Sequence, residues 1–158
     1  MGAVFANIIG MTNQQGSIFL ASFTIANVVM QYPIGRMSDR FDRRLVILIV
    51  ASISGLAAAI AAIVGLSNYW TLLGLTAIFG GFSMTIYSLC IAHANDYLSP
   101  SQMVGTASAL ITVNGIGAIF GPPIIAALVD LFGSYMFFAI LSAVHIGLGL
   151  FVLARMYM

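Results

Sequence analysis

The stretch GRMSDRFDRR, residues 35–44, holds six of the nine charged residues of this chain. The other three are Asp96, Asp130 and Arg155, and the sequence contains neither lysine nor glutamate. Of its 158 residues, 61% are hydrophobic and 6% are charged. A soluble domain carries about 25% charged residues, which keep its surface in water. This chain cannot cover a water-facing surface, so we expect a lipid bilayer to be its main solvent.

The charged residues separate long apolar runs, and the lengths of these runs predict five membrane-spanning helices. A spanning helix needs about 20 residues, because the hydrocarbon layer is about 30 Å thick and each residue adds about 1.5 Å. The uncharged run 45–95 is too long for one helix, and we expect it to fold back at LSNYW, residues 66–70. The predicted spans lie near residues 16–35, 45–66, 70–92, 102–127 and 132–155.

Residues 1–11 are apolar but too short to cross a membrane. They are either an interfacial segment or the end of a helix that starts upstream, and we favour the second interpretation. Alternation of the spans places all five arginines on one side of the membrane. By the positive-inside rule, the loop 36–44 and the C-terminus are then cytoplasmic.

Several function classes are disfavoured by composition. The formal net charge of +1 lacks the basic stripe that a nucleic-acid partner requires. Cys90 is the single cysteine, so an internal disulfide is excluded and a metal site is not expected. The sequence has no His-Glu-x-x-His, Gly-x-Ser-x-Gly or Gly-Lys-Ser/Thr motif. We therefore expect no enzyme, no cofactor and no metal.

The stretch GRMSDRFDRR fits the pattern Gly-x-x-x-Asp-Arg-x-x-Arg-Arg and resembles the cytoplasmic loop signature of the major facilitator superfamily. With its flank, QYPIGRMSDRFDRR is similar to the loop between helices eight and nine in the YcaD-like bacterial subgroup. SLCIAHAND, residues 88–96, and GIGAIFGPPI, residues 115–124, are similar to the end of helix ten and to helix eleven. The resemblance implies an all-α polytopic bundle that forms the C-terminal half of this fold, with residues 1–11 as the end of helix seven.

The resemblance also implies a function, a location and a partner. It implies transport of a small solute across the bacterial inner membrane by alternating access, with the solute held between two halves. The N-terminal half would come from the same chain, a separate chain or a second copy of this one. A truncated or stand-alone bundle with a structural or oligomerising role remains the alternative.

The charged loop has a physical rationale. Gly35 lets a helix end approach a neighbouring backbone, and Asp39 can lie against the positive N-terminus of a neighbouring helix. The other residues of the pattern can pair with carboxylates or helix-end carbonyls: Arg40, Arg43 and Arg44. The resemblance implies that this loop latches the two halves in the outward-facing state. The alternative is a positively charged anchor at the membrane surface.

Polar residues inside the predicted spans are candidates for lining a solute pathway. Thr24, Asn27 and Gln31 have the spacing i, i+3, i+7 and share one helix face. An unpaired amide is costly in hydrocarbon, so this face should meet protein or water. The further candidates are Tyr87, Asn114 and His145. The alternative is helix–helix hydrogen bonding of about 0.6–2 kcal/mol, with His145 a neutral imidazole instead of a proton relay.

Small residues and prolines predict close packing and a bend in the span 102–127. Gly117 and Gly121 form a Gly-x-x-x-Gly pair, which lets helices approach closely. Pro122 and Pro123 follow directly and remove two backbone donors, so we expect the helix to bend there.

Overall fold

The computed structural model describes residues 2–64 and 67–157, and this part of the chain contains helices and no strand. The helices follow in the order α1 (Gly2–Ile8), α2 (Asn13–Ser38), α3 (Arg43–Ile63), α4 (Tyr69–Ser83), α5 (Thr85–Asn95), α6 (Pro100–Phe132) and α7 (Met136–Tyr157). Residues 65–66, which the predicted span 45–66 and the fold-back include, lie outside the described residues, as does residue 1 of the predicted segment 1–11.

Five helical segments of the described chain are long and apolar enough to cross a membrane. They are α2, α3, the pair α4 and α5 taken together, α6 and α7. The predicted all-α polytopic bundle is therefore confirmed. Most of these helices extend a few residues beyond the apolar runs, because their polar ends supply caps and interfacial turns.

Polar residues between the apolar runs cap the starts of helices. At α2, the Thr12 side chain accepts from the Gln15 N–H and the Gln15 side chain accepts from the Thr12 N–H. Asn68 accepts from the Trp70 N–H at the start of α4, at 2.9 Å. The helix α6 is capped at its end by Gly133, whose φ of 103° suits glycine because it has no side chain to clash. Polar residues thus fix where α2 and α4 begin, and a glycine caps the end of α6.

The predicted span 70–92 is divided into α4 and α5 at Met84. The Thr85 hydroxyl donates to the Phe82 carbonyl at 2.6 Å, and the Met84 N–H reaches the Gly80 carbonyl at 3.4 Å. A hydroxyl that bonds back to the preceding turn competes with the backbone ladder and bends a helix. The sequence offers neither glycine nor proline at Met84, so the interruption was not predicted.

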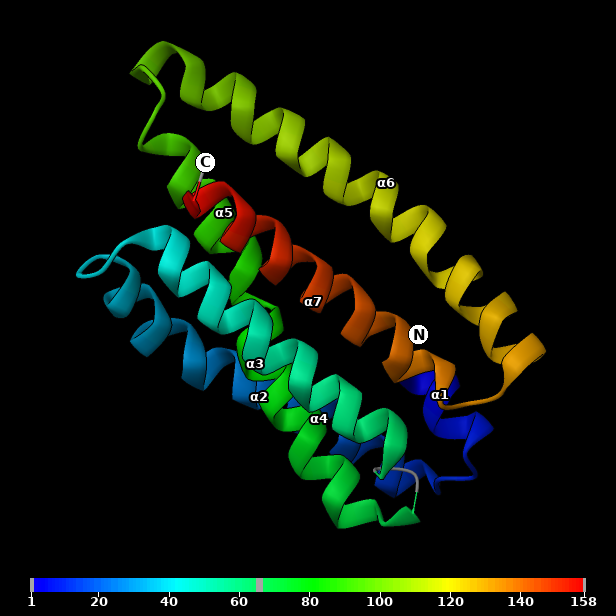
Figure 1. The fold of residues 1–158 in the computed structure, drawn as a ribbon. Coiled ribbons are helices and arrows are strands. Elements are labelled where there is room, and N and C mark those ends of the chain that lie inside the picture. The colour runs from blue at the N-terminus through cyan, green and yellow to red at the C-terminus, as the bar shows by residue number, and fades with distance from the viewer. Residues whose placement is uncertain (1, 65–66, 158) are drawn as a thin grey trace.

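The core forms where α3 packs against α7 and α4, and where α4 packs against α2 (Figure 1). The close approach of α4 to α2 depends on Gly80. A Cβ atom at this position would lie 2.7 Å from the Phe23 carbonyl oxygen. At the end of the bundle where α1 lies, Phe5 stacks on Phe137 and meets Phe138 edge to face. These contacts fix α1 against α7.

The helix α6 extends beside α7, away from the other helices (Figure 1). Val129 is its single buried residue. The helix is assigned without a break through Pro122 and Pro123. A Cβ atom at Gly117 or Gly121 would meet no other atom within 4 Å. The Gly-x-x-x-Gly face is therefore open, and close packing through it remains a prediction.

Candidate functional site

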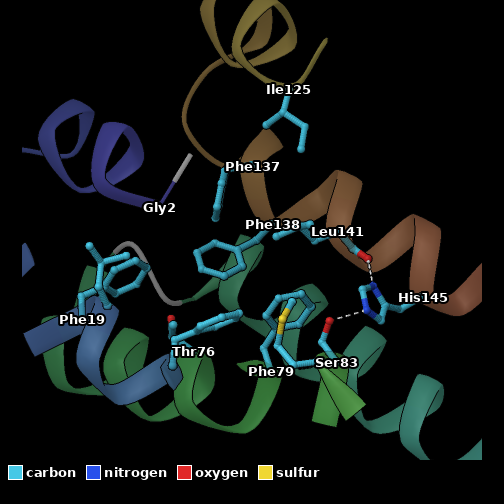
Figure 2. A pocket seen from close by; sticks show the side chains of 13 residues that line it. Gly2, Phe19, Thr76, Phe79, Ser83, Ile125, Phe137, Phe138, Leu141 and His145 are labelled. Atoms are coloured by element: carbon cyan, nitrogen blue, oxygen red, sulfur yellow. Dashed lines mark hydrogen bonds between the residues drawn. The ribbon is translucent and has the colours of Figure 1, made fainter. Parts of the chain in front are cut away.

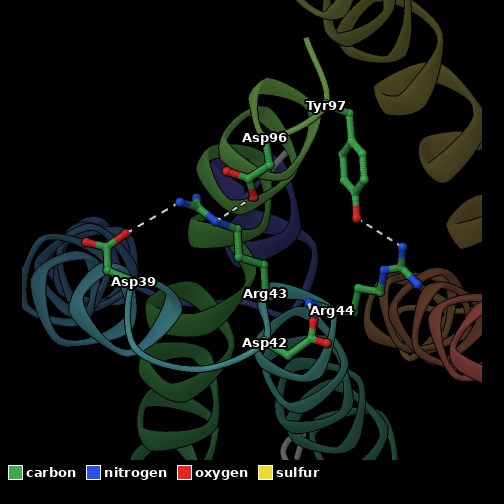
Figure 3. A network of polar contacts seen from close by, with 6 residues as sticks. All are labelled: Asp39, Asp42, Arg43, Arg44, Asp96 and Tyr97. Carbon is green, nitrogen blue, oxygen red and sulfur yellow. Dashed lines mark hydrogen bonds and ion pairs between the residues drawn. The ribbon is translucent and has the colours of Figure 1, made fainter.

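The charged loop forms a cluster with the end of α5 (Figure 3). The Arg43 guanidinium lies between two carboxylates: its Nε is 2.9 Å from Asp96 and one Nη is 3.7 Å from Asp39. Asp39 caps the end of α2, Arg43 begins α3 and Asp96 caps the end of α5. One side chain thus connects three helix ends. The Arg43 side chain is 25% exposed, whereas the Asp39 side chain is 72% exposed.

The neighbouring Arg44 points away from this cluster, toward α7 (Figure 3). Its guanidinium donates to the Tyr97 hydroxyl at 3.1 Å, which is a neutral partner. Its own backbone N–H donates to Asp42 at 2.8 Å, so that Asp42 caps α3. The two adjacent arginines therefore differ: Arg43 is neutralised by carboxylates and Arg44 is not.

The remaining residues of the loop pattern, Gly35 and Arg40, take no part in this cluster. Arg40 is exposed and makes no side-chain hydrogen bond or ion pair with any described residue. Gly35 is partly buried, but a Cβ atom there would meet nothing within 4 Å. Within this chain, Gly35 does not permit any close approach that an alanine would prevent.

A cavity of about 390 Å³ lies between α2, α4 and α7, with Gly2 and Ile125 at its border (Figure 2). Its wall is mostly apolar and includes five phenylalanines, and its polar side chains are Thr76, Ser83 and His145. Thr76 is buried, and its hydroxyl has no hydrogen-bond partner in the described structure. Among the residues that the structure describes, no acidic side chain or arginine lines this cavity.

His145 is bonded to the neighbouring helix α4. Its Nε2 lies 2.8 Å from the Ser83 hydroxyl, and its Nδ1 lies 2.7 Å from the Leu141 carbonyl (Figure 2). A carbonyl can only accept, so Nδ1 carries a proton and donates to it. Nε2 can then accept from the Ser83 hydroxyl, and a neutral imidazole satisfies both bonds. This geometry supports the interpretation of His145 as a bonded neutral side chain.

The other predicted lining residues lie elsewhere on the bundle. Thr24 and Gln31 are exposed on α2, with Asn27 half-buried beside them, and the Thr24 hydroxyl donates to the Leu20 carbonyl at 3.0 Å. Asn114 is exposed on α6 and Tyr87 is exposed on α5. None of these five residues lines the cavity at His145. The structure thus leaves the polar face of α2 open and builds its cavity from other residues.

Sequence reasoning missed four polar residues at these places: Thr76, Ser83, Asp96 and Tyr97. Asp96 belongs to the stretch SLCIAHAND, which is similar to the end of helix ten of the family. This similarity could have indicated that Asp96 lies at the same membrane surface as the charged loop. Ser83 and Thr76 had none, because single hydroxyls in apolar helices occur without any functional role. Thr76 and Ser83 line the cavity only because α4 packs next to α2 and α7.

Comparison with known proteins decides the family. The family model described as the Major Facilitator Superfamily matches residues 1–158 of this chain. The chain belongs to the major facilitator superfamily. The MFS-type transporter YcaD of Escherichia fergusonii is 25% identical over 141 residues, and that of Escherichia coli O17:K52:H18 is 27% identical over 147 residues. The resemblance predicted from the loop is therefore confirmed.

Each of these matches covers 89% of this chain and 36% of the relative. The chain thus spans about a third of the length of the superfamily transporters that it matches. No solved structure matches it. Membership, together with the five apolar segments, makes this an integral multi-pass membrane protein of a transporter family.

Proposed function

We propose that this chain acts as the C-terminal half of a secondary carrier that moves a small solute by alternating access. The proposal rests on the two ion pairs of Arg43, a residue of the loop that fits the family's signature. These ion pairs link the end of α2 to the end of α5. In such carriers, one half rocks against the other around a site near the bilayer midplane. The exposed polar face of α2, with Asn27 at its centre, supports a surface that meets the other half.

The charged loop is proposed to act as a latch within this cycle. Arg43 holds Asp96 closely and Asp39 loosely, so a small shift of α2 would break the weaker contact first. Asp39 is largely exposed and can bind the N-terminus of a helix in the other half, where an anion is favoured. The cluster would then form in the outward-facing state and open in the other.

The proposed orientation places the charged loop and the C-terminus in the cytoplasm. Arg44 at the start of α3 and Arg155 near the end of α7 line one cavity, so both lie at the same end of the bundle. The other arginines belong to the same loop or to the last turn of α2. An end that gathers the arginines is expected on the cytoplasmic side of the inner membrane.

The intact mass of the polypeptide in its native membrane tests whether this chain is one half of a carrier. The sequence corresponds to 16.7 kDa. We expect a mass more than twice this value, since the relatives are longer. A mass of 16.7 kDa would leave a separately encoded half or a second copy as partner. A chain of that mass without any partner would favour the stand-alone bundle.

The latch is tested in the full-length carrier by the accessibility of a cysteine at Asn27, with Cys90 replaced by alanine. A membrane-impermeant thiol reagent is applied to right-side-out and inside-out vesicles. We expect Asp39→Ala to shift labelling from the outer to the cytoplasmic side. Asp130→Ala, at the end of α6 and outside the cluster, is the matched control. Equal labelling ratios for Asp39→Ala and the parent, at equal membrane level, would contradict the latch.

A further inference from the structure

A second cavity, of about 260 Å³, opens where α3 begins and where α5 and α7 end. Its polar wall consists of Arg44, His93 and Arg155. Its apolar wall consists of Ile47, Leu148, Phe151 and Val152, with Cys90 beside them. The charged loop belongs to the proposed latch, but its Arg44 points away from Arg43 and Asp39, toward α7 (Figure 3). Four residues of α7 line this cavity together with Arg44.

The charge of this cavity is positive and uncompensated. Within the described part of the chain, no acidic side chain lines it. Two carboxylates beside Arg43 and Arg44 are engaged elsewhere: Asp96 binds Arg43, and Asp42 caps α3. In the ranges 2–64 and 67–157, neither Arg44 nor Arg155 forms an ion pair. Two guanidinium groups that share a cavity without a counter-charge favour an anion, and guanidinium groups bind phosphate oxygens particularly well.

The polar and apolar walls are arranged by depth in the membrane. Each helix places its polar residue at the end and an apolar residue about one turn deeper: Arg44 and Ile47 on α3, His93 and Cys90 on α5, Arg155 and Val152 on α7. Phe151 and Leu148 continue the apolar wall toward the middle of α7. A phospholipid has the same order, with its phosphate at the surface and its acyl chains below.

We propose that this cavity binds an anionic phospholipid, with its phosphate between Arg44 and Arg155 and an acyl chain against Phe151 and Leu148. Basic pockets between membrane helices at the cytoplasmic surface bind such headgroups, and each arginine near an anionic surface strengthens binding about fivefold. Tyr97 supports the site, because its hydroxyl accepts from the Arg44 guanidinium and its ring contacts His93 edge to face. The site requires only that the bundle lies in a bilayer and is independent of transport.

Native mass spectrometry of the protein purified from its membrane tests the proposal. The probes are dioleoyl phosphatidylglycerol, which is anionic, and dioleoyl phosphatidylcholine, which has no net charge. We expect the parent to retain the anionic lipid preferentially. Arg44→Gln and Arg155→Gln should each weaken its binding about fivefold. Arg155→Lys, which keeps the charge, should retain most of the binding.

The matched control is Arg36→Gln. Arg36 lies in the last turn of α2, where it donates to the Tyr32 hydroxyl at 3.1 Å and lines no part of this cavity. Equal loss of lipid in all three glutamine variants would mean non-specific attraction and would overturn the site. Unchanged binding in Arg44→Gln and Arg155→Gln would also overturn it.

A competition experiment distinguishes a lipid from a free anion as the ligand of this cavity. Millimolar inorganic phosphate is added to the parent protein with bound phosphatidylglycerol. Retention of the lipid supports the proposal, since the acyl chain contributes to its binding. Displacement to the level of the glutamine variants would show a site for a soluble anion and would overturn the lipid assignment.

Arg155 is exposed on the last turn of α7, so its variants are expected to remain folded.

Discussion

The Nε atom of Arg43 lies 2.9 Å from a carboxylate oxygen of Asp96, and this contact ties the first residue of α3 to the cap of α5. Both side chains keep some exposure, so water and salt screen their attraction. We expect a coupling of about 0.2–1 kcal/mol from a double-mutant cycle of Arg43→Gln and Asp96→Asn. The measurement is reversible unfolding in detergent micelles.

The coupling of Arg43 and Asp96 should decrease in high salt, because the Debye length falls to about 3 Å at 1 M ionic strength. Asp130→Asn in place of Asp96→Asn is the control and should show no coupling with Arg43. A coupling that is absent at low salt would show that the contact contributes nothing to the stability of the fold.

Replacement of Gly80 by alanine should destabilise the bundle. The new Cβ atom would lie 2.7 Å from the Phe23 carbonyl oxygen, which is backbone and cannot swing aside. The helices α2 and α4 must then separate, at a cost of about 1–3 kcal/mol. The control is Gly74→Ala on the same helix, where the Cβ atom meets nothing within 4 Å. It should stabilise the bundle by up to about 0.5–1 kcal/mol, because alanine favours a helix interior more than glycine does. Equal effects of the two substitutions would contradict the packing.

The hydrogen bond between Ser83 and His145 should contribute to the docking of α7 on α4. A double-mutant cycle of Ser83→Ala and His145→Leu is expected to give a coupling of about 0.6–1.7 kcal/mol, as interhelical bonds in membranes do. The measurement is the free energy of unfolding in a bilayer-like detergent. Ser17→Ala, whose hydroxyl bonds within its own helix, should show no coupling with His145→Leu. A coupling near zero would mean that His145 is held by the Leu141 carbonyl alone.

Opposite ends of the bundle should react with thiol reagents from opposite sides of the membrane. Phe41→Cys places a thiol in the exposed turn before α3, and Tyr135→Cys places one in the turn before α7. With Cys90 replaced by alanine, an impermeant reagent should label the first from the cytoplasmic side and the second from outside. The measurement is labelling of intact cells and of inverted vesicles. The reverse pattern would overturn the proposed orientation.

The sequence predicted five helical spans because charge is expensive in lipid. Asp42 and Asn68 stand where the chain leaves the apolar layer, and both cap the helix that follows. The division at Met84 escaped prediction because it arises from a hydroxyl that bonds to its own preceding turn. Periodicity alone cannot distinguish such a bond from a normal helix.

The site was less predictable than the spans. The pairing of Arg43 with Asp96 depends on how α3 and α5 pack, and no local pattern encodes the distance between them. The cavity at His145 is likewise assembled from side chains of several helices. The spacing of Thr24, Asn27 and Gln31 predicted a polar face on α2, but the role of this face depends on which part of the protein covers it. Local chemistry was therefore visible in the sequence, and tertiary neighbours were not.

The length and isolation of α6 have a consequence for the order of assembly. Its 33 residues extend about 50 Å at about 1.5 Å each, well beyond a hydrocarbon layer of about 30 Å. Its apolar character suffices for insertion, since hydropathy and not packing carries a helix into the bilayer. The helix can therefore enter the membrane independently and join its neighbours afterwards. Loss of the few contacts that α6 makes with α7 and α5 would let it move sideways into the lipid while the rest of the bundle stays together.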